Sequence, residues 1–378
     1  MVDGSQTDVP KVKILFLPTN NPGVVWYRMY QFANKMSELG LAHCRMFPDW
    51  NPQNMQMQNW EEEYDKIMPS LTMMVDWADF VVVQYVHSAK GLSLVQAIRD
   101  LKPTFMEADD YFSQVPHESL AYDSNMPGYA QDVWATRQII ESKGVVTTTD
   151  YLKEHYTQWN KNIHVMPNCI DFDLWDSYKT HSNGKVRIGW IGGDTHRGDL
   201  KLVKDVLYET LNRHPQAEVY IVCGNPPDWE KHERMHLVGT WSLITEYPRK
   251  LKDLAFDIGI APLKDHYFNR GKSNLKYLEY SACRIPTVAS NVEPFKRDFK
   301  GYVCNNDDEW LFNLSNLIDN VDLRLQVGWN AYYDVKEKFN LNTIARKYAD
   351  MVAESVWQKP KALGIFSFDD VDIRVKLV

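Results

Sequence analysis

The sequence has few cysteines, and their spacing suits neither a zinc site nor a disulfide framework. The five are odd in number and lie far apart, and no two of them have C-x-x-C spacing: Cys44, Cys169, Cys223, Cys283 and Cys304. This pattern argues against a zinc ribbon and against a disulfide-stapled secreted domain. We therefore expect a reducing, cytoplasmic setting.

Long apolar runs are also missing. No stretch approaches the ~20 residues that a membrane-spanning helix needs. The first ten residues are polar and lack the apolar core of a signal peptide. We expect no transmembrane segment, and the residues do not indicate an oligomeric state.

Positive charge is scarce in the first half of the chain. Residues 1–178 carry 13 Lys and Arg against 23 Asp and Glu, a net charge of −10, whereas residues 179–378 have a net charge of +2. A polyanionic partner on the first half is therefore disfavoured. A phosphate-bearing ligand would have to be held by a local group of cations and not by a general positive field.

Short apolar runs alternate with helical segments along the whole chain. Lys13–Leu17, Phe80–Gln84 and Val186–Ile191 are continuous apolar runs, which are typical of parallel strands buried on both faces. The rhythm restarts after a polar break at 177–184. We predict an α/β protein with two Rossmann-like, doubly wound domains that face a central cleft. Further strands are expected at 144–147, 163–165, 217–222, 256–261 and 286–289, and helices at 24–41, 92–101, 132–143, 200–212, 321–338 and 341–357.

The most informative stretch is 271–290. It predicts a helix that leads into a short buried strand, with Ser273 or Asn274 at the helix N-cap. Lys272 lies at the mouth of this helix. A helix N-terminus with a lysine beside it favours a phosphate group.

A carboxylate follows further along the same helix. Lys276 and Glu279 share one face, at i and i+3. The carboxylate can accept hydrogen bonds from a sugar diol. A nucleotide sugar presents both groups, a diphosphate and a ribose, close together.

A glycine turn opens the second half. Ile191–Leu200 reads as a strand end, a turn with Gly192 and Gly193, and a helix start. Glycine lets the backbone approach a phosphate closely, and Arg197 adds a cationic fork. The alternative is an ordinary turn in which Asp199 caps the helix and Arg197 is solvated.

The loop after the first strand, at 18–28, has a related form. Gly23 permits a close backbone approach, and Arg28 could reach a bound anion or pair with an acid. Three acids follow the short strand at 103, namely Glu107, Asp109 and Asp110. They could act as a general base, a metal site or a hydrogen-bonding clamp, or form an acid cluster at a helix N-terminus. We favour carboxylates that touch the substrate over a metal site.

Three further side chains are weaker candidates. His87 follows the strand at Phe80 and could face the cleft, although a lone histidine there is more often structural. Trp241 and Tyr247 bracket a later loop. An aromatic ring there could stack on a nucleobase, but core packing is the commoner role.

Over residues 11–357, these features resemble the GT-B glycosyltransferases of the retaining, family-4-like kind. Leu275–Ser290 matches that family's block L-x-x-x-E-x-x-A-x-x-x-P-V-V-A-S. Asn162–Asp171 is similar to its v-i-P-N-g-v-D link, and Thr147–Leu152 to its preceding v-t-s-d-x-l. The loop with Arg197 resembles the family's Lys-Gly phosphate loop, with Arg in place of Lys.

The resemblance implies a hexosyl- or pentosyltransferase that moves a sugar from a nucleotide sugar to an acceptor hydroxyl. Transfer would proceed with retention and without a metal or other cofactor. Residues 1–176 would bind the acceptor, which is a saccharide, a lipid-linked saccharide or a modified DNA base. Residues 177–338 would bind the nucleotide sugar, and 339–378 would supply a helix that crosses back to the first domain, plus a tail.

The resulting site has three groups of residues. The catalytic candidates are Arg197 and Lys272, which would hold the diphosphate, with Glu107 and Asp109. The donor-binding candidates are Gly23, Gly192, Gly193, Thr195, His196, Gly271, Ser273, Asn274, Tyr247 and Glu279, of which Glu279 would bind the ribose. The acceptor-side candidates are Arg28, His87 and Asp110.

The chain departs from the family pattern at three places. The paired-glutamate motif would need an acid where this chain has Gly271, so the backbone N–H groups of Gly271 and Lys272 are expected to take over sugar recognition. A further arginine of the phosphate loop falls at Gly193. The acids at 107–110 occupy the place where many members keep a catalytic histidine.

These departures leave other functions open. One is a GT-B sugar-nucleotide epimerase, which shares the cleft but uses no acceptor. A second is a catalytically degenerate GT-B module that only binds. A third is a DNA-base glycosyltransferase of the phage type, against which the acidic first half counts.

Overall fold

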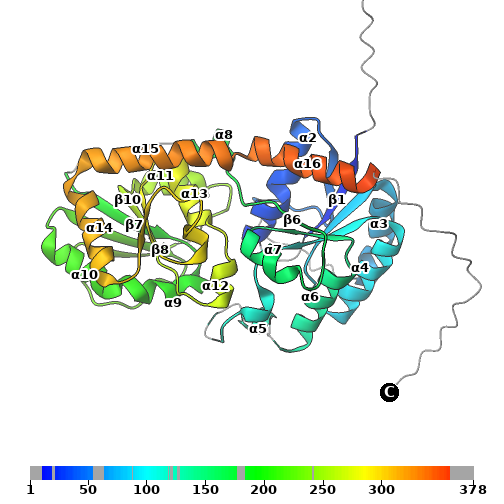
Figure 1. Ribbon diagram of the computed structural model, residues 1–378, viewed down its shortest axis with the longest axis horizontal. Coiled ribbons are helices and arrows are strands. Elements are labelled where there is room, and N and C mark those ends of the chain that lie inside the picture. Colours follow the sequence, from blue (N-terminus) through cyan, green and yellow to red (C-terminus); the bar gives the residue numbers. More distant parts are fainter. Residues whose placement is uncertain are drawn as a thin grey trace, which may run out of the picture.

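The computed structural model describes residues 11–18, 22–53, 64–86, 88–117, 119, 122–125, 128–176, 184–240 and 242–357. Two α/β halves lie side by side, and two long helices run one after the other along one edge of both (Figure 1). Each half has a parallel six-stranded sheet with helices on both faces. This confirms the predicted fold class.

The first sheet has the strand order β2-β1-β3-β4-β5-β6. Alternate residues of β1 enter different cores: Ile14 and Phe16 pack under α2 and α16, whereas Leu15 and Leu17 pack under α3 and α4. Burial on both faces explains the continuous apolar runs. The strands are β1 (Lys13–Leu17), β2 (His43–Met46), β3 (Phe80–Gln84), β4 (Thr104–Ala108), β5 (Gly144–Thr147) and β6 (Ile163–Val165).

The predicted first helix is divided into three parts. α1 (Pro22–Val25) leads into a π-helical turn (Trp26–Tyr30), which α2 (Gln31–Glu38) continues. The other helices of this half are α3 (Tyr64–Trp77), α4 (Ala89–Leu101), α5 (Tyr122–Asn125), α6 (Ala130–Glu141) and α7 (Asp150–Tyr156), with a 3-10 turn at Phe112–Gln114. The short helix α8 (Phe172–Trp175) follows β6 in the chain but packs into the core of the second half.

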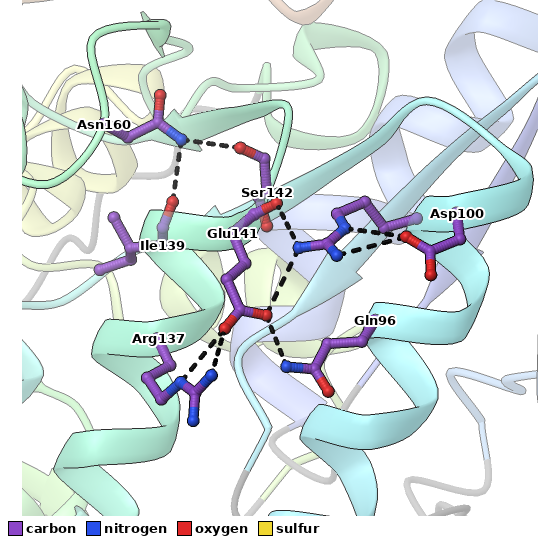
Figure 2. A network of polar contacts seen from close by, with 8 residues as sticks. Gln96, Asp100, Arg137, Ile139, Glu141, Ser142 and Asn160 are labelled. Carbon is purple, nitrogen blue, oxygen red and sulfur yellow. Dashed lines mark hydrogen bonds and ion pairs between the residues drawn. The ribbon is translucent and has the colours of Figure 1, made fainter. Parts of the chain in front are cut away.

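A carboxylate network ties α4 to α6 (Figure 2). Glu141 accepts hydrogen bonds from Gln96 at 2.6 Å and from Arg137 at 2.7 Å, and Arg99 reaches it at 3.4 Å. Although partial burial opposes ionisation, these donors together lower the pKa of Glu141. The network holds two helices that cover one face of the first sheet.

The second sheet has the order β12-β11-β10-β7-β8-β9. Its strands are β7 (Val186–Ile191), β8 (Ala217–Cys223), β9 (Met235–Gly239), β10 (Ile258–Ala261), β11 (Thr287–Ser290) and β12 (Tyr302–Cys304). Its helices are α9 (Arg197–Leu200), α10 (Lys204–Arg213), α11 (Tyr247–Leu254), α12 (Tyr267–Gly271), α13 (Leu275–Ala282), α14 (Asp307–Asp319) and α15 (Val321–Lys338), with 3-10 turns at Asp194–His196, Lys201–Val203 and Glu293–Phe295.

One close contact fixes α13 against this sheet. A Cβ at Gly259 would come within 2.5 Å of the Tyr280 ring, so glycine leaves the space that the ring fills. The Tyr280 hydroxyl also accepts the backbone N–H of Ile191, at 3.4 Å. The helix α13 is thereby held against β10 and the carboxyl end of β7.

The chain returns to the first half at its end. α16 (Leu341–Trp357) packs on α2, and its residues Leu341, Ile344 and Tyr348 belong to the core of the first sheet. The predicted boundary at 176/177 falls between β6 and β7, where residues 177–183 lie outside the described part. Residues 358–378 are also outside it.

Candidate functional site

A cavity of about 380 Å³ lies between the two halves, and both contribute to its wall. Gly23, Arg28, Asp109, Asp110 and Asn168 line it from the first half. Thr195, His196, Lys272, Ser273 and Lys276 line it from the second. Its volume is in the range of small-molecule sites, which run from about 300 to 1,000 Å³.

The mouth of α13 supplies the cationic part of this wall. Lys272 is the C-cap residue that follows α12. Its Nζ lies 3.6 Å from the Asp110 carboxylate of the first half and 4.4 Å from the centre of the Phe268 ring. Asn274 takes the N-cap position of α13 but makes no side-chain cap hydrogen bond. The helix therefore begins without a side-chain cap from Asn274, beside a cavity that Lys272, Ser273 and Lys276 line, and such a helix start suits an anion.

Glu279 lies behind this wall and joins the two halves. Its side chain is 2% exposed, and its Oε1 accepts the Tyr27 hydroxyl at 2.8 Å. Its Oε2 accepts the Tyr247 hydroxyl at 3.0 Å and the Lys276 ammonium at 3.1 Å. Burial and the Glu279 charge raise the pKa of Tyr27 well above its usual range, so its hydroxyl remains a donor. A carboxylate has about four acceptor positions, and three are filled here.

The π-helical turn places Arg28 beside Tyr27 but points it into the first half. Arg28 is 1% exposed, and its Nε donates to Glu107 at 2.6 Å. Its Nη1 donates to the Met166 carbonyl at 2.7 Å and to Asn168 Oδ1 at 3.0 Å. Burial raises the pKa of Glu107, although the Arg28 charge opposes this rise.

Asn168 carries this network across to the second half. Arg28 can only donate, so the Asn168 oxygen must face it, and the amide nitrogen then faces Ser273. That nitrogen donates to Ser273 Oγ at 2.7 Å. A chain of hydrogen bonds thus leads from the first sheet to the mouth of α13. It joins the Glu107 carboxylate, the Arg28 guanidinium, the Asn168 amide and the Ser273 hydroxyl, in that order.

A histidine–aspartate pair lies on the opposite part of the wall. His196 Nδ1 is 2.9 Å from Asp199 Oδ2, and Asp199 Oδ1 accepts the Lys264 N–H and the Asn269 amide. Burial lowers the pKa of His196, and the Lys272 charge lowers it further, whereas the hydrogen bond to Asp199 acts in the opposite direction. The predicted helix cap at Asp199 is therefore wrong, because its carboxylate orients His196 and holds the loop before α12.

The neighbouring acids Asp109 and Asp110 have different electrostatic surroundings. Burial, together with Asp110 and Glu107, raises the pKa of Asp109 well above its usual range. Asp110 faces Lys272 instead. One protonatable carboxyl and one ion-paired carboxylate therefore share the first-half side of the cavity.

The structure brings most of the predicted residues to one place. Eight line the cavity: Gly23, Arg28, Asp109, Asp110, Thr195, His196, Lys272 and Ser273. Glu107 contacts Arg28 from behind, and Tyr247 and Glu279 contact Lys276, another cavity-lining residue. The side chain of Arg197 is outside the described part, but its neighbours His196 and Gly198 line the cavity. His87 and Trp241 also lie outside the described residues.

A Cβ at Gly192 or Gly271 would meet a neighbouring side chain within 3 Å, whereas a Cβ at Gly193 would meet nothing closer than 3.8 Å. A Cβ at Gly271 would lie 2.9 Å from Leu152 and 3.2 Å from Tyr111, so this position is closed by the first half and has no room for an acid. The backbone N–H of Lys272 already donates to the Asn269 carbonyl, so it is not available for sugar recognition as expected. A Cβ at Gly192 would lie 2.7 Å from the Trp190 ring. Neither Gly192, Gly193 nor Gly271 is among the cavity-lining residues.

Sequence reasoning missed two residues that connect the halves. Tyr27 lies next to Arg28 in the π-helical turn, and the two side chains point in different directions, to Glu279 and to Glu107. Asn168 belongs to the Asn162–Asp171 motif, but the sequence alone gives it no role. Its signal was a polar amide directly after the apolar end of β6 and a proline.

No protein-family model and no curated protein sequence matches the chain. Solved structures do match it over nearly its whole length. The chain has the GT-B fold. Sucrose-phosphate synthase from Thermosynechococcus elongatus aligns at 12% identity and a TM-score of 0.61, over 91% of this chain and 99% of that one.

Two other GT-B structures show the same extent of likeness. HepE of Anabaena, in complex with UDP-glucose, aligns at 13% identity and a TM-score of 0.61, over 91% of this chain and all (100%) of the other. A candidate UDP-N-acetylglucosamine 2-epimerase from Listeria monocytogenes aligns at 10% identity and a TM-score of 0.57, over 91% and 96% of the chains. At these identities the likeness concerns the fold.

Two features are absent from the part of the chain that the structure describes. Among its residues, no group of three or more His, Cys, Asp or Glu residues is arranged to hold a metal ion. None of the described helices has both the length and the apolar composition needed to cross a bilayer. All five cysteines are free.

Proposed function

We propose that this protein is a glycosyltransferase that moves a sugar from a nucleotide sugar to an acceptor hydroxyl with retention and without a metal. One observation carries the proposal: Lys272, Ser273 and the first turn of α13 converge on a cavity between two Rossmann-like halves. In such folds ligands bind beyond the carboxyl ends of the strands.

The leaving diphosphate would lie against the mouth of α13. Lys272 supplies a full positive charge, and the free N–H groups of the helix supply a partial one. Arg197, which begins α9 beside the cavity-lining His196, is the proposed second cation. Together these groups stabilise the negative charge that develops as the glycosyl–phosphate bond breaks.

The sugar would then face the first half of the wall. Positive charge builds on the sugar as the leaving group departs, and the acceptor hydroxyl attacks from the same face, with its proton passing to the leaving phosphate. Asp109 and Asp110 line the side from which an acceptor would approach. A saccharide or lipid-linked saccharide suits these acids, because its hydroxyls can donate to carboxylates.

The ribose would be bound by Glu279 after a local rearrangement. Oε2 is filled by Tyr247 and Lys276, whereas Oε1 accepts only Tyr27 among the described residues. A ribose hydroxyl can therefore replace the Tyr27 hydroxyl at Oε1 without breaking the contacts within the second half. Because Tyr27 belongs to the first half, this exchange would accompany donor entry.

A donor screen followed by a transfer assay tests the function. We expect one class of nucleotide sugar to raise the melting temperature, because a ligand that binds only the folded state stabilises it. Transfer from that donor to saccharide acceptors should give a product with the donor's anomeric configuration. Transfer should persist in the presence of EDTA and be lost in Lys272→Met. It should be retained in the control Lys347→Met, whose exposed side chain lies on α16. Equal transfer by Lys272→Met and the wild type would refute the site.

A sugar-nucleotide epimerase is the second candidate. The protonatable Asp109 favours it, because a carboxyl group with a raised pKa can exchange a proton with a sugar carbon. Incubation with the stabilising nucleotide sugar alone separates the two functions. An epimer formed without acceptor, with deuterium incorporated from heavy water, would establish the epimerase and reject transfer.

A further inference from the structure

Arg28 has one group that its neighbours leave unused. Its Nε and Nη1 make three hydrogen bonds, but its Nη2 has no partner among the described residues, although the side chain is 1% exposed. Arg28 also lines the cavity. A buried guanidinium N–H without a partner is costly, and a ligand acceptor would remove that cost.

Ser273 has a second unused donor on the facing wall. Its Oγ accepts the Asn168 amide N–H at 2.7 Å. The hydroxyl hydrogen of Ser273 is therefore left to donate elsewhere, and Ser273 lines the same cavity. Arg28 fixes the direction of this contact, because it holds the Asn168 oxygen at 3.0 Å.

We propose that Arg28 Nη2 and the Ser273 hydroxyl bind one phosphate of the leaving group from both halves of the protein, with Asn168 as the positioning residue between them. This inference rests on the proposed function and names further residues for the same site. Two hydrogen bonds, of 3.0 and 2.7 Å, separate the guanidinium from the serine oxygen.

The position of Ser273 favours the leaving group over an anionic acceptor. Ser273 lies between Lys272 and α13, where the helix N-terminus favours negative charge. A phosphate that reaches Ser273 is therefore the one held at the mouth of α13.

This arrangement makes the diphosphate a link between the halves. Arg28 belongs to the turn after β1, whereas Ser273 precedes α13. A ligand that accepts from both favours the closed arrangement over any open one. We therefore expect pyrophosphate alone, without sugar or base, to stabilise the interface.

Calorimetric titration with inorganic pyrophosphate and with UDP tests the inference. Ser273→Ala and Arg28→Lys should each weaken pyrophosphate binding by about tenfold or more, because a hydrogen bond to a charged group contributes about 1.5–3 kcal/mol and 1.4 kcal/mol is tenfold. Ser273→Thr, which keeps the hydroxyl, should bind as the wild type does. Arg28→Lys keeps a charge for Glu107 but has no second guanidinium nitrogen.

The role of Asn168 needs its own readout. If Asn168 acts by positioning Ser273, Asn168→Ala and Ser273→Ala should weaken pyrophosphate binding less than additively when combined. Additive losses would mean that Asn168 acts independently. The melting temperatures of the single variants serve as the control that separates a loss of pyrophosphate binding from a loss of folding.

Thr149→Val is the matched control. It removes another hydrogen bond between the halves, from Thr149 to the Gly271 carbonyl at 3.3 Å, and neither of these two residues is among those that line the cavity. It should lower the melting temperature, because Thr149 also caps α7, but leave pyrophosphate binding unchanged. Equal losses in Thr149→Val and Ser273→Ala would overturn the inference.

Two further results would also overturn it. Wild-type pyrophosphate affinity in Arg28→Lys and Ser273→Ala would refute this inference alone and leave the proposed function standing. So would a rise in the acceptor KM of Arg28→Lys with unchanged UDP affinity, which would place the anion on the acceptor. If the wild-type protein binds neither pyrophosphate nor UDP, the proposed function fails as well.

Discussion

The hydrogen bond between Tyr27 and Glu279 offers a quantitative test of how the halves are joined. It spans 252 positions of sequence and is 2.8 Å long. Tyr27→Phe removes the hydroxyl and keeps the ring, so it opens no cavity of note. It leaves Glu279 Oε1 buried without a donor among the described residues.

The expected cost follows from the charge and the burial. Hydrogen bonds to charged groups contribute about 1.5–3 kcal/mol, and Glu279 is only 2% exposed. We therefore expect Tyr27→Phe to lower the free energy of opening between the halves by about 1.5–3 kcal/mol. In a Glu279→Gln background, the acceptor is neutral, so the same change should cost only about 0.5–1.5 kcal/mol.

Native-state hydrogen exchange is the suitable assay, because unfolding of a two-domain chain need not be a single transition. The backbone amides of α13 and of the π-helical turn report on the interface. The four proteins of the double-mutant cycle give the coupling energy between Tyr27 and Glu279, which we expect to be about 1 kcal/mol or more.

Ligand binding adds a second readout. Because a ribose hydroxyl is proposed to replace Tyr27 at Oε1, Tyr27→Phe should bind UDP as tightly as the wild type or more tightly. Unchanged exchange at α13 would show that the bond does not hold the halves together. Weaker UDP binding would show that Tyr27 is a ligand contact, and the proposed exchange would be wrong.

Three further predictions concern the cavity wall. Because the pKa of Asp109 is raised from 3.8, the folded state binds its proton more readily, and wild-type stability falls as pH rises through the window above 3.8. Asp109→Asn should therefore melt at a higher temperature than the wild type at pH 7, with the gap closing towards pH 3.8; a less stable variant at pH 7 would contradict this. Gly271→Ala should cost about 1–3 kcal/mol in thermal unfolding, because its Cβ would meet Leu152 at 2.9 Å, and Leu152→Ala in the same chain should relieve part of the loss. Lys272→Met should weaken UDP binding, with a smaller difference at high salt because part of the attraction is screened; salt-independent affinities in both proteins would count against a phosphate contact.

Much of the fold could be predicted because the two sheets are parallel. β1, β3 and β7 are buried on both faces, which leaves continuous apolar runs in the sequence. The edge strand β2 was missed, because its residues, His43–Met46, alternate between exposed and half-buried positions. The strands β9 and β12 are likewise partly exposed edge strands.

The candidate site, too, could be predicted from the sequence only in part. The mouth of α13 could be predicted, because Lys272, Ser273, Lys276 and Glu279 are neighbours along the chain. The partners of Glu279 and Ser273 in the first half could not, since they come from positions more than 100 residues away. The role of Gly271 depends on packing against the other half, which no local pattern encodes.

The central claim is that the leaving diphosphate binds between the halves, at the mouth of α13. A crystal structure of the protein with the stabilising nucleoside diphosphate tests it most directly. The account predicts phosphate oxygens within hydrogen-bonding distance of Lys272 Nζ, the Ser273 hydroxyl and Arg28 Nη2. A nucleotide bound elsewhere, with these three groups unchanged and without contact to it, would contradict the account.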